Sequence, residues 1–369
     1  MQKALIVKEP KVPFTLVDVP IPKPGPGELL VKVLACALNP VDHAIQLMDI
    51  LPGTTYPAVL GFDIAGDIVE VGEGVEGWVK GDRVFFPANG YNYGGFQQYT
   101  LASVDAIGKI PAHMSYAEAS SIPLTFTTAA IPLMSVNPIG AGLNPTFDSK
   151  VNFNGEAALV IGGGSSVGQF GMYMSFFLLI SHIVLVFLAI QILKYVGYST
   201  IITYASAKHT EFLKSIGATH VVDRAEVPID KLPEAVKSIT SSPNGIKTIY
   251  LAVLRDDEVF KMAYTCLAPG GQMATALPPL MLESEKAKLP ANDGRKLYGV
   301  WASTRVEPNI AYGKGMWKNL PVLMEERVIK PNRVEILPGG LAAVADALPK
   351  FFQDGVSGVK LVVNPQDTA

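Results

Sequence analysis

The sequence predicts an α/β protein with a β-rich N-terminal barrel and a doubly wound parallel sheet in the middle of the chain. Short β-branched runs, separated by proline and glycine, fill the first 125 residues. The pattern turns helical from Glu118, and beyond a Gly/Pro/Asn-rich loop at residues 137–156 continuous apolar runs alternate with helical stretches. Such alternation favours parallel strands that helices cover on both faces. The chain of 369 residues is long enough for two such cores.

The domain boundaries are expected where these patterns change. Residues 1–125 form the barrel domain and residues 126–304 form the parallel-sheet domain. The barrel strands are expected at residues 4–9, 29–38, 63–72 and 82–87. The sheet strands are expected at residues 157–163, 200–205, 220–223, 247–253 and 272–277, and a last strand near the C-terminus at 360–365.

Composition excludes several classes of function. The formal net charge of −3 gives no basic surface for nucleic acid. The two cysteines, Cys36 and Cys266, are too few for a disulfide framework or a four-thiolate zinc site. The first residues lack the apolar core of a secretory signal, so we expect a reduced, cytoplasmic compartment.

A glycine-rich segment, IGGGSSVG at residues 161–168, follows the first strand of the expected sheet. Gly163, Ser165 and Gly168 stand at the three positions of the G-x-G-x-x-G fingerprint, with serine in place of the middle glycine. Gly163 permits a tight turn and Gly168 allows close helix–strand packing, while N–H groups around Ser166 face a pyrophosphate. An ordinary turn is the alternative, but the strand–helix alternation behind the loop favours a dinucleotide site.

The second strand of the sheet ends in residues that suit NADPH. The residue that reads the ribose is expected about 20 positions beyond the glycine loop, yet this strand tip starts at Thr203, 40 residues after Gly163. The tip carries no Asp or Glu for a free 2′-hydroxyl and offers Ser206, Lys208 and His209. These residues suit a 2′-phosphate; a solvated loop with a chance lysine is the alternative.

An apolar run at residues 171–189 accounts for the excess length. Without the 18 residues 171–188, the spacing between Gly163 and Thr203 falls from 40 to 22 residues. The segment SSVGQF then joins AIQILKYVGYS in one helical pattern. A membrane span here would put the barrel and most of the sheet on opposite sides of a bilayer, which argues against an anchor. We interpret residues 171–188 as an anomalous insertion and hypothesise a translated intron. The full chain is then expected to be poorly soluble and weak in NADPH binding.

Several segments, in order along the chain, resemble the medium-chain dehydrogenase/reductase superfamily. They are ELLVKVLACALNPVDH, YPAVLGFDIAGDIVEVGEGVEGWVKGDRV, GGFQQYTLA, IPLTFTTAA, LKSIGATHVVD, LAPGGQM and VSGVKLVV. The GAGLNP loop and the serine-bearing glycine loop are most similar to the fungal enoyl-reductase-like branch, which includes trans-acting enoyl reductases. The resemblance implies a GroES-like catalytic domain, in which residues 305–369 complete residues 1–125, and a Rossmann domain that binds NADPH.

The resemblance also implies roles for individual residues. Asn39, Asp42 and His43 line the floor under the nicotinamide, and Thr128 lies near its carboxamide. Asn39 and Asp42 are therefore candidate catalytic residues, and Asp42, His43 and Thr128 candidate cofactor ligands. The other candidate cofactor-binding residues are Gly163, Gly164, Ser165, Ser166, Val167, Gly168, Ser206, Lys208, His209, Val253 and Lys360. Asp63 is expected to accept hydrogen bonds from the backbone.

No metal site is expected. Zinc alcohol dehydrogenases of the superfamily have a cysteine ligand where this chain has Asn39 and a histidine ligand where it has Phe62. Neither an amide nor a phenyl ring replaces a thiolate or an imidazole on Zn²⁺. The cysteine-rich loop that binds structural zinc is also missing.

Without a Lewis acid, hydride addition to an activated C=C bond is easier than carbonyl reduction, because charge spreads into an enolate. We expect a zinc-independent, NADPH-dependent reductase of an enone or enoyl thioester. Close relatives often carry a lysine where this chain has Ala44, so the proton donor stays open among Tyr56, Tyr91, Tyr93 and solvent. Of these, Tyr56 is taken as the candidate catalytic residue.

Alternative interpretations are an NADPH:quinone reductase, an NADPH-binding structural protein and an inactive mis-spliced product. A small-molecule or acyl-thioester substrate is expected, with no nucleic acid or membrane partner, in a monomer or homodimer.

Overall fold

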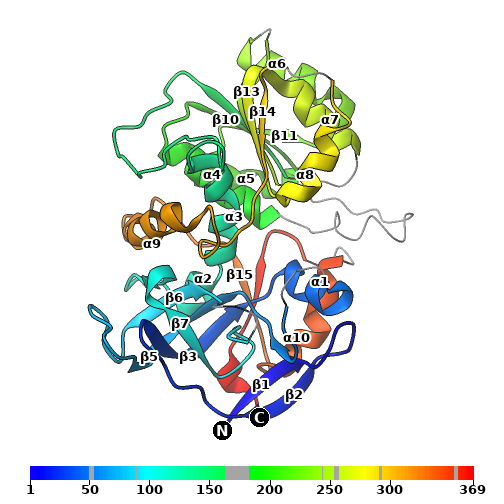
Figure 1. The fold of residues 1–369 in the computed structure, drawn as a ribbon. Coiled ribbons are helices and arrows are strands. Elements are labelled where there is room, and N and C mark those ends of the chain that lie inside the picture. The colour runs from blue at the N-terminus through cyan, green and yellow to red at the C-terminus, as the bar shows by residue number, and fades with distance from the viewer. Residues whose placement is uncertain are drawn as a thin grey trace. The chain divides into compact units, whose positions relative to one another are not determined.

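The computed structural model describes residues 1–49, 54–88, 90, 92–162, 183–242, 244–252, 257–290, 293–352 and 356–369. Tertiary contacts divide the chain into two units (Figure 1). The first unit comprises residues 1–124, 316–327 and 331–369, and the second comprises residues 125–315 and 328–330.

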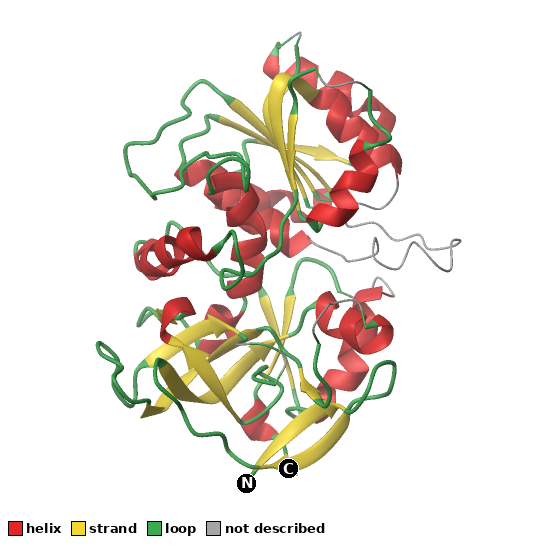
Figure 2. Cartoon of the chain, in the orientation of Figure 1, coloured by secondary structure: helices red, strands yellow, loops and turns green. Residues whose placement is uncertain are grey.

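The strands of the first unit form two sheets in the part of the chain that the structure describes (Figure 2). The larger follows the order β15-β16-β3-β5-β6-β8, and β7 also pairs with β3. Its pairs are antiparallel except for β15 and β16, which are parallel. The smaller sheet is antiparallel, in the order β2-β1-β4. The strands are β1 (Gln2–Val7), β2 (Thr15–Val19), β3 (Glu28–Ala37), β4 (Ala58–Val59), β5 (Asp63–Val71), β6 (Arg83–Pro87), β7 (Tyr99–Ser103), β8 (Gly108–Lys109), β15 (Val334–Leu337) and β16 (Lys360–Val363).

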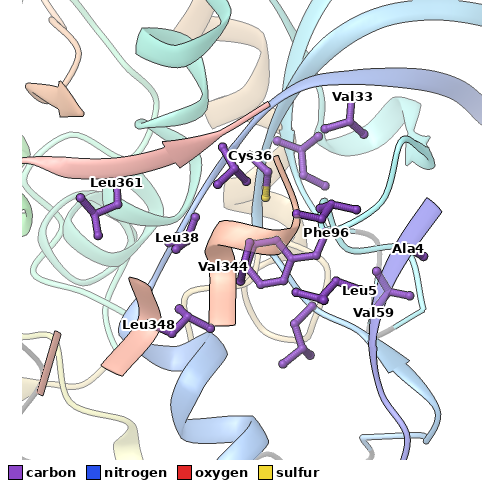
Figure 3. Close-up of a cluster of buried hydrophobic side chains, with 14 of the residues drawn as sticks. Ala4, Leu5, Val33, Cys36, Leu38, Val59, Phe96, Val344, Leu348 and Leu361 are labelled. Carbon is purple, nitrogen blue, oxygen red and sulfur yellow. The ribbon is translucent and has the colours of Figure 1, made fainter. Parts of the chain in front are cut away.

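One apolar core joins these sheets (Figure 3). Cys36 and Leu38, at the end of β3, lie in it with Leu361 of β16. Leu5 of β1 brings the smaller sheet into the same cluster, and Val344 brings in helix α10 (Ala342–Ala347). The C-terminal residues therefore complete the packing of the N-terminal barrel, and β16 supplies a strand that pairs with β3.

The second unit contains a parallel sheet, which confirms the predicted doubly wound fold. Its described strands follow the order β11-β10-β9-β12-β13-β14, and each neighbouring pair is parallel. The chain runs outward from β9 in one direction and then returns to start again at β12. The carboxyl ends of β9 and β12 therefore mark the point where ligands bind in such sheets. The strands are β9 (Ala157–Ile161), β10 (Thr200–Ala205), β11 (His220–Asp223), β12 (Ile246–Leu251), β13 (Leu267–Thr275) and β14 (Lys296–Tyr298).

Helices cover both faces of this parallel sheet. Helices α6 (Leu232–Thr240) and α7 (Asp257–Cys266) pack on the face that presents Leu159 and Ile161. The opposite face carries α4 (Ile183–Tyr195), since Gly162 at the end of β9 faces Val186 of this helix. The remaining helices are α1 (Pro40–Met48), α2 (Tyr116–Ser120), α3 (Pro123–Met134), α5 (Thr210–Ile216), α8 (Pro279–Lys286) and α9 (Ile310–Glu325).

The predicted insertion is only partly within the described residues. Residues 171–182 lie outside them, whereas residues 183–188 are described and belong to α4. Of the helices in the described ranges, none has the length and apolar character needed to cross a membrane.

Residues 305–315 lie in the second unit, whereas the sequence led us to assign them to the first. Their contacts explain this. Tyr312 stacks on Phe147 with ring centroids 5.9 Å apart, and its hydroxyl donates to the carbonyl oxygen of Ala130 at 3.4 Å. These partners belong to the second unit, and the chain returns to the first unit at Met316, within α9.

Candidate functional site

Asp42 fixes the first turn of α1 in the first unit. Its Oδ2 accepts the backbone N–H of Asn39 at 2.8 Å, and its Oδ1 accepts the N–H of Gly61 at 2.9 Å. Gly61 has a φ of 95°, which glycine adopts without strain, and an added Cβ would lie 2.7 Å from Phe96. The carboxylate therefore ties the start of α1 to the turn before β5.

Asp42 is fully buried, and burial raises its pKa from 3.8 to about 7. The two backbone N–H donors oppose this change because they stabilise the carboxylate, whereas the charge of nearby Asp63 raises the pKa further. Burial also raises the pKa of the Cys36 thiol well above its ordinary range, and Asp42 and Asp63 add to this. A neutral thiol therefore lies beside the two carboxyl groups.

A second buried group links three distant parts of the first unit. The Nζ of Lys360 lies 2.9 Å from Oδ2 of Asp63 and also donates to Oδ1 of Asn39. The Nδ2 of Asn39 donates to the same Asp63 oxygen at 2.9 Å. The backbone N–H of Leu124 donates to the other oxygen, Oδ1, at 2.6 Å. This contact confirms that Asp63 accepts a backbone hydrogen bond.

The structure therefore brings Asn39, Asp42 and Lys360 together, with Asp63 as their common neighbour. Lys360 is 2% exposed and Asp63 is fully buried. The pairing of Lys360 with Asp63 was not predicted, although one feature of the sequence indicated a buried partner for the lysine. Lys360 begins the apolar strand KLVV, and a lysine at a buried strand position needs a charged or polar partner.

The side chains at the two positions compared with zinc ligands do not suit zinc. The Asn39 amide is held by Asp63 and Lys360, and Phe62 offers a phenyl ring. Among the residues that the structure describes, no group of three or more His, Cys, Asp or Glu side chains could hold a metal ion.

Of two other predicted site residues, His43 lies on α1 and Tyr56 contacts the residue just beyond its end. The His43 ring is half-buried, with its centroid 5.1 Å from that of Phe352, and burial lowers its pKa, which favours the neutral imidazole. The Tyr56 hydroxyl donates to Oδ1 of Asp49, just beyond the end of α1, at 2.8 Å. Tyr91 lies outside the described residues.

The predicted cofactor residues of the second unit are described in part. Residues 163–168 and Val253 lie outside the described residues. At the end of β10, Lys208 is exposed, Ser206 is half-buried and His209 is buried. Thr128 is buried on α3, and its carbonyl oxygen accepts the Tyr250 hydroxyl at 3.3 Å.

One carboxylate at the β10 tip was not predicted from the sequence. Asp223, the last residue of β11, accepts the N–H of Ala207 at 3.2 Å and that of Ala225 at 3.1 Å through Oδ1. Because β10 and β11 are parallel neighbours, their carboxyl ends meet at one edge of the sheet. The sequence feature that could have identified it is the run HVVD, a strand that ends in an aspartate.

Comparison with known proteins identifies the family. Residues 25–112 match the alcohol dehydrogenase GroES-like domain, and residues 187–312 match the zinc-binding dehydrogenase family. The trans-enoyl reductase tndF of Aspergillus flavipes is 31% identical to this chain, with 98% of each protein covered. The chain belongs to the medium-chain dehydrogenase/reductase superfamily. Members of this superfamily are oxidoreductases that bind nicotinamide nucleotides, and this chain is a reductase of that type.

Solved structures of this superfamily show the same fold. The CurK enoyl reductase superposes with a TM-score of 0.75 at 21% identity, covering 98% of this chain and 99% of that protein. The quinone oxidoreductase from Coxiella burnetii superposes with a TM-score of 0.65 at 23% identity. The match covers 98% of this chain and 99% of that protein.

Proposed function

We propose that this reductase transfers a hydride from NADPH to an activated C=C bond, in an enone or an enoyl thioester, without zinc. The observation that carries the proposal is the position of Asn39, whose amide is held between Asp63 and Lys360 inside the first unit. An amide committed in this way is a poor zinc ligand. Reduction of a C=C bond suits such a site because the negative charge spreads over an enolate and needs no Lewis acid.

The buried groups act as positioning residues. Asp42 fixes the first turn of α1 through two backbone N–H groups, and Asn39 connects that turn to Asp63 and Lys360. A buried network with satisfied partners keeps one geometry. The residue after Asp42 is His43, so the network holds the backbone that presents the half-buried imidazole ring.

The β10 tip supports NADPH over NADH. The exposed Lys208 ammonium suits a 2′-phosphate, and Ser206 adds a hydroxyl donor. The Asp223 carboxylate accepts two backbone N–H groups and so shapes the same turn. When bound, NADPH supplies the hydride, while the chain binds and orients it and the substrate.

Tyr56 is the proton donor in this proposal. Its hydroxyl donates to Oδ1 of Asp49 at 2.8 Å, so the O–H exchanges this hydrogen bond for the substrate before it delivers its proton. A positioned general acid accelerates proton transfer by roughly 10²–10⁴-fold. Tyr56 also packs against the apolar core of the first unit, which limits the motion of its ring.

The test is NADPH oxidation with four substrates: an enone, an enoyl thioester, a quinone and an aldehyde. It is run on the full chain and on a version without residues 171–188, with and without a strong chelator. We expect turnover of the enone or thioester, weak turnover of the aldehyde and no effect of the chelator. Faster turnover of the quinone would favour a quinone reductase, and NADPH binding without turnover would favour a structural protein. Stoichiometric zinc with chelator-sensitive turnover would contradict the zinc-free site.

A further inference from the structure

Helix α3 carries a proline, Pro132, in its interior. Proline has no backbone N–H, so it cannot donate the hydrogen bond that a helical residue gives to the carbonyl oxygen four positions earlier. That carbonyl belongs to Thr128, which is buried. The helix continues beyond the proline, because the N–H of Ser135 donates to the carbonyl oxygen of Ile131 at 3.2 Å. A donor from outside the helix is therefore expected at Thr128.

A tyrosine of the parallel sheet supplies that donor. The hydroxyl of Tyr250, on β12, donates to the carbonyl oxygen of Thr128 at 3.3 Å. Its neighbours Ile249 and Leu251 lie in the apolar cluster with α6 and α7, so strand alternation turns Tyr250 to the opposite face. Tyr250 is fully buried, and burial raises its pKa, so the hydroxyl keeps the proton that it donates. The hydroxyl therefore reaches the carbonyl oxygen that Pro132 cannot serve.

The same turn of α3 is held from a second side. The hydroxyl of Thr127 donates to the carbonyl oxygen of Ala302, beyond the end of β14, at 3.3 Å. Thr127, Thr128, Tyr250 and Ala302 all belong to the second unit. A helix that lacks a ladder hydrogen bond at a proline is prone to bend there, so contacts from outside decide its local geometry. These two hydrogen bonds fix the turn that carries Thr128.

We propose that Tyr250 is a positioning residue, whose hydroxyl replaces the N–H that Pro132 lacks and so holds Thr128 in place beside the nicotinamide. Tyr250 acts through Thr128 and does not touch the reacting atoms. The helix part of this inference rests on the contacts of α3 alone. The nicotinamide part rests on the proposed function, in which Thr128 lies near the carboxamide. A small displacement of such a contact slows hydride transfer, because the reacting atoms are no longer aligned.

A cycle of two substitutions in the full chain tests the helix part. Tyr250→Phe takes a donor away from the buried carbonyl oxygen of Thr128, so the midpoint of thermal unfolding should fall by roughly 4 °C. Pro132→Ala restores an N–H at this turn, and in that background the fall caused by Tyr250→Phe should be less than half as large. If Tyr250→Phe alone does not fold, recovery of the fold in the double variant reports the same coupling.

Tyr312→Phe is the matched control for this cycle. The Tyr312 hydroxyl is also buried and donates to another carbonyl oxygen of α3, that of Ala130, at 3.4 Å. The residue four positions beyond Ala130 is Met134, which has a backbone N–H. Tyr312→Phe should therefore lower the midpoint equally with and without Pro132→Ala. A fall for Tyr250→Phe that Pro132→Ala leaves unchanged would overturn the helix part.

The nicotinamide part is tested by the rate of hydride transfer from NADPH to the enoyl thioester in a single turnover. The full chain and the version without residues 171–188 are both measured. Tyr250→Phe should slow this step about tenfold, because the carboxamide contact is displaced, and Thr128→Val should slow it by a similar factor. Tyr250→Phe combined with Thr128→Val should be no slower than Thr128→Val alone, although its unfolding midpoint still falls. Tyr312→Phe should leave the rate unchanged.

The outcomes separate the two parts of the inference. Losses of rate that multiply when Tyr250→Phe and Thr128→Val are combined would show that Tyr250 does not act through Thr128. An unchanged rate in Tyr250→Phe would overturn the positioning role. If the thermal cycle gives the expected result but neither form of the chain transfers hydride, the helix part stands and the proposed function fails.

Discussion

The ammonium group of Lys360 lies 2.9 Å from the carboxylate of Asp63, and both side chains are shielded from solvent. Burial of two charges is costly, and their attraction offsets that cost only where further hydrogen bonds satisfy the remaining atoms. Asn39 bridges the pair, and the N–H of Leu124 completes the coordination of Asp63. The pair therefore depends on a fold of the first unit that brings Asp63 of β5, the N-terminus of α1, Leu124 and the start of β16 together.

Lys360→Met is expected to lower the free energy of unfolding by about 3–5 kcal/mol, because Asp63 is left as an unpaired buried charge. Lys360→Met combined with Asp63→Asn should recover part of this loss, as measured by chemical denaturation. Lys3→Met is the control. The Nζ of Lys3 lies 3.2 Å from Oδ2 of Asp18, but these side chains are 36% and 57% exposed. The substitution should therefore lower the free energy of unfolding by about 1 kcal/mol or less. Equal costs for the two lysines would contradict the buried network.

The raised pKa of Asp42 predicts a specific pH dependence of stability. The folded state binds a proton more tightly than the unfolded chain, with a pKa of about 7 against 3.8. Tighter proton binding stabilises the folded state by up to about 4 kcal/mol. This stabilisation is fully present below pH 4 and is lost as the pH rises to 7. Asp42→Asn removes this titration, so the stability of the original protein relative to the variant should fall between pH 4 and 7. A constant difference across that range would show that Asp42 does not titrate there.

Lys208→Ala should remove most of the preference for NADPH. We expect the original site to bind NADPH at least tenfold more tightly than NADH, about 1.4 kcal/mol. Dissociation constants for both nucleotides are compared in the chain without residues 171–188. Lys237→Ala, an exposed lysine on α6, is the control and should leave the ratio unchanged. Unchanged discrimination in Lys208→Ala would rule out the assigned phosphate contact.

Tyr56→Phe should lower kcat by about 100-fold without changing NADPH affinity, because it removes the proposed proton donor. Tyr116→Phe is a matched control, since the Tyr116 hydroxyl also donates to an aspartate, Asp67, in the same unit. Its kcat should stay close to that of the original protein. A Tyr56→Phe protein with full activity would assign protonation to Tyr91, Tyr93 or solvent.

The sequence predicted the parallel sheet because each strand is a local apolar run bounded by a helical pattern. The family resemblance implied that Asn39 and Asp42 lie together, and in the structure Asp42 accepts the N–H of Asn39 in the first turn of α1. The contact of Lys360 with Asn39 spans 321 positions and leaves no local pattern. Only a charged residue at the start of an apolar strand indicated that a buried partner exists.

The packing of α4 on the end of β9 was not predictable from periodicity. Residues 18 positions apart occupy the same helix face, so an apolar pattern alone does not decide which of them contacts the strand. The contact between Gly162 and Val186 is a tertiary fact that only the structure supplies. The carboxylate of Asp223 was missed for a similar reason, because it reaches the β10 tip from the neighbouring strand.

The most direct test of the proposed reaction uses NADPH deuterated at the transferring position, with an enoyl thioester and the chain lacking residues 171–188. Product analysis by mass spectrometry and NMR locates the deuterium. Hydride transfer to an activated C=C bond predicts a saturated thioester with one deuterium at the β-carbon and, at the α-carbon, a hydrogen that comes from solvent through the proton donor. Deuterium on C1, the former thioester carbonyl carbon, in an aldehyde or alcohol product would contradict the proposed reaction, as would no deuterium transfer despite bound NADPH.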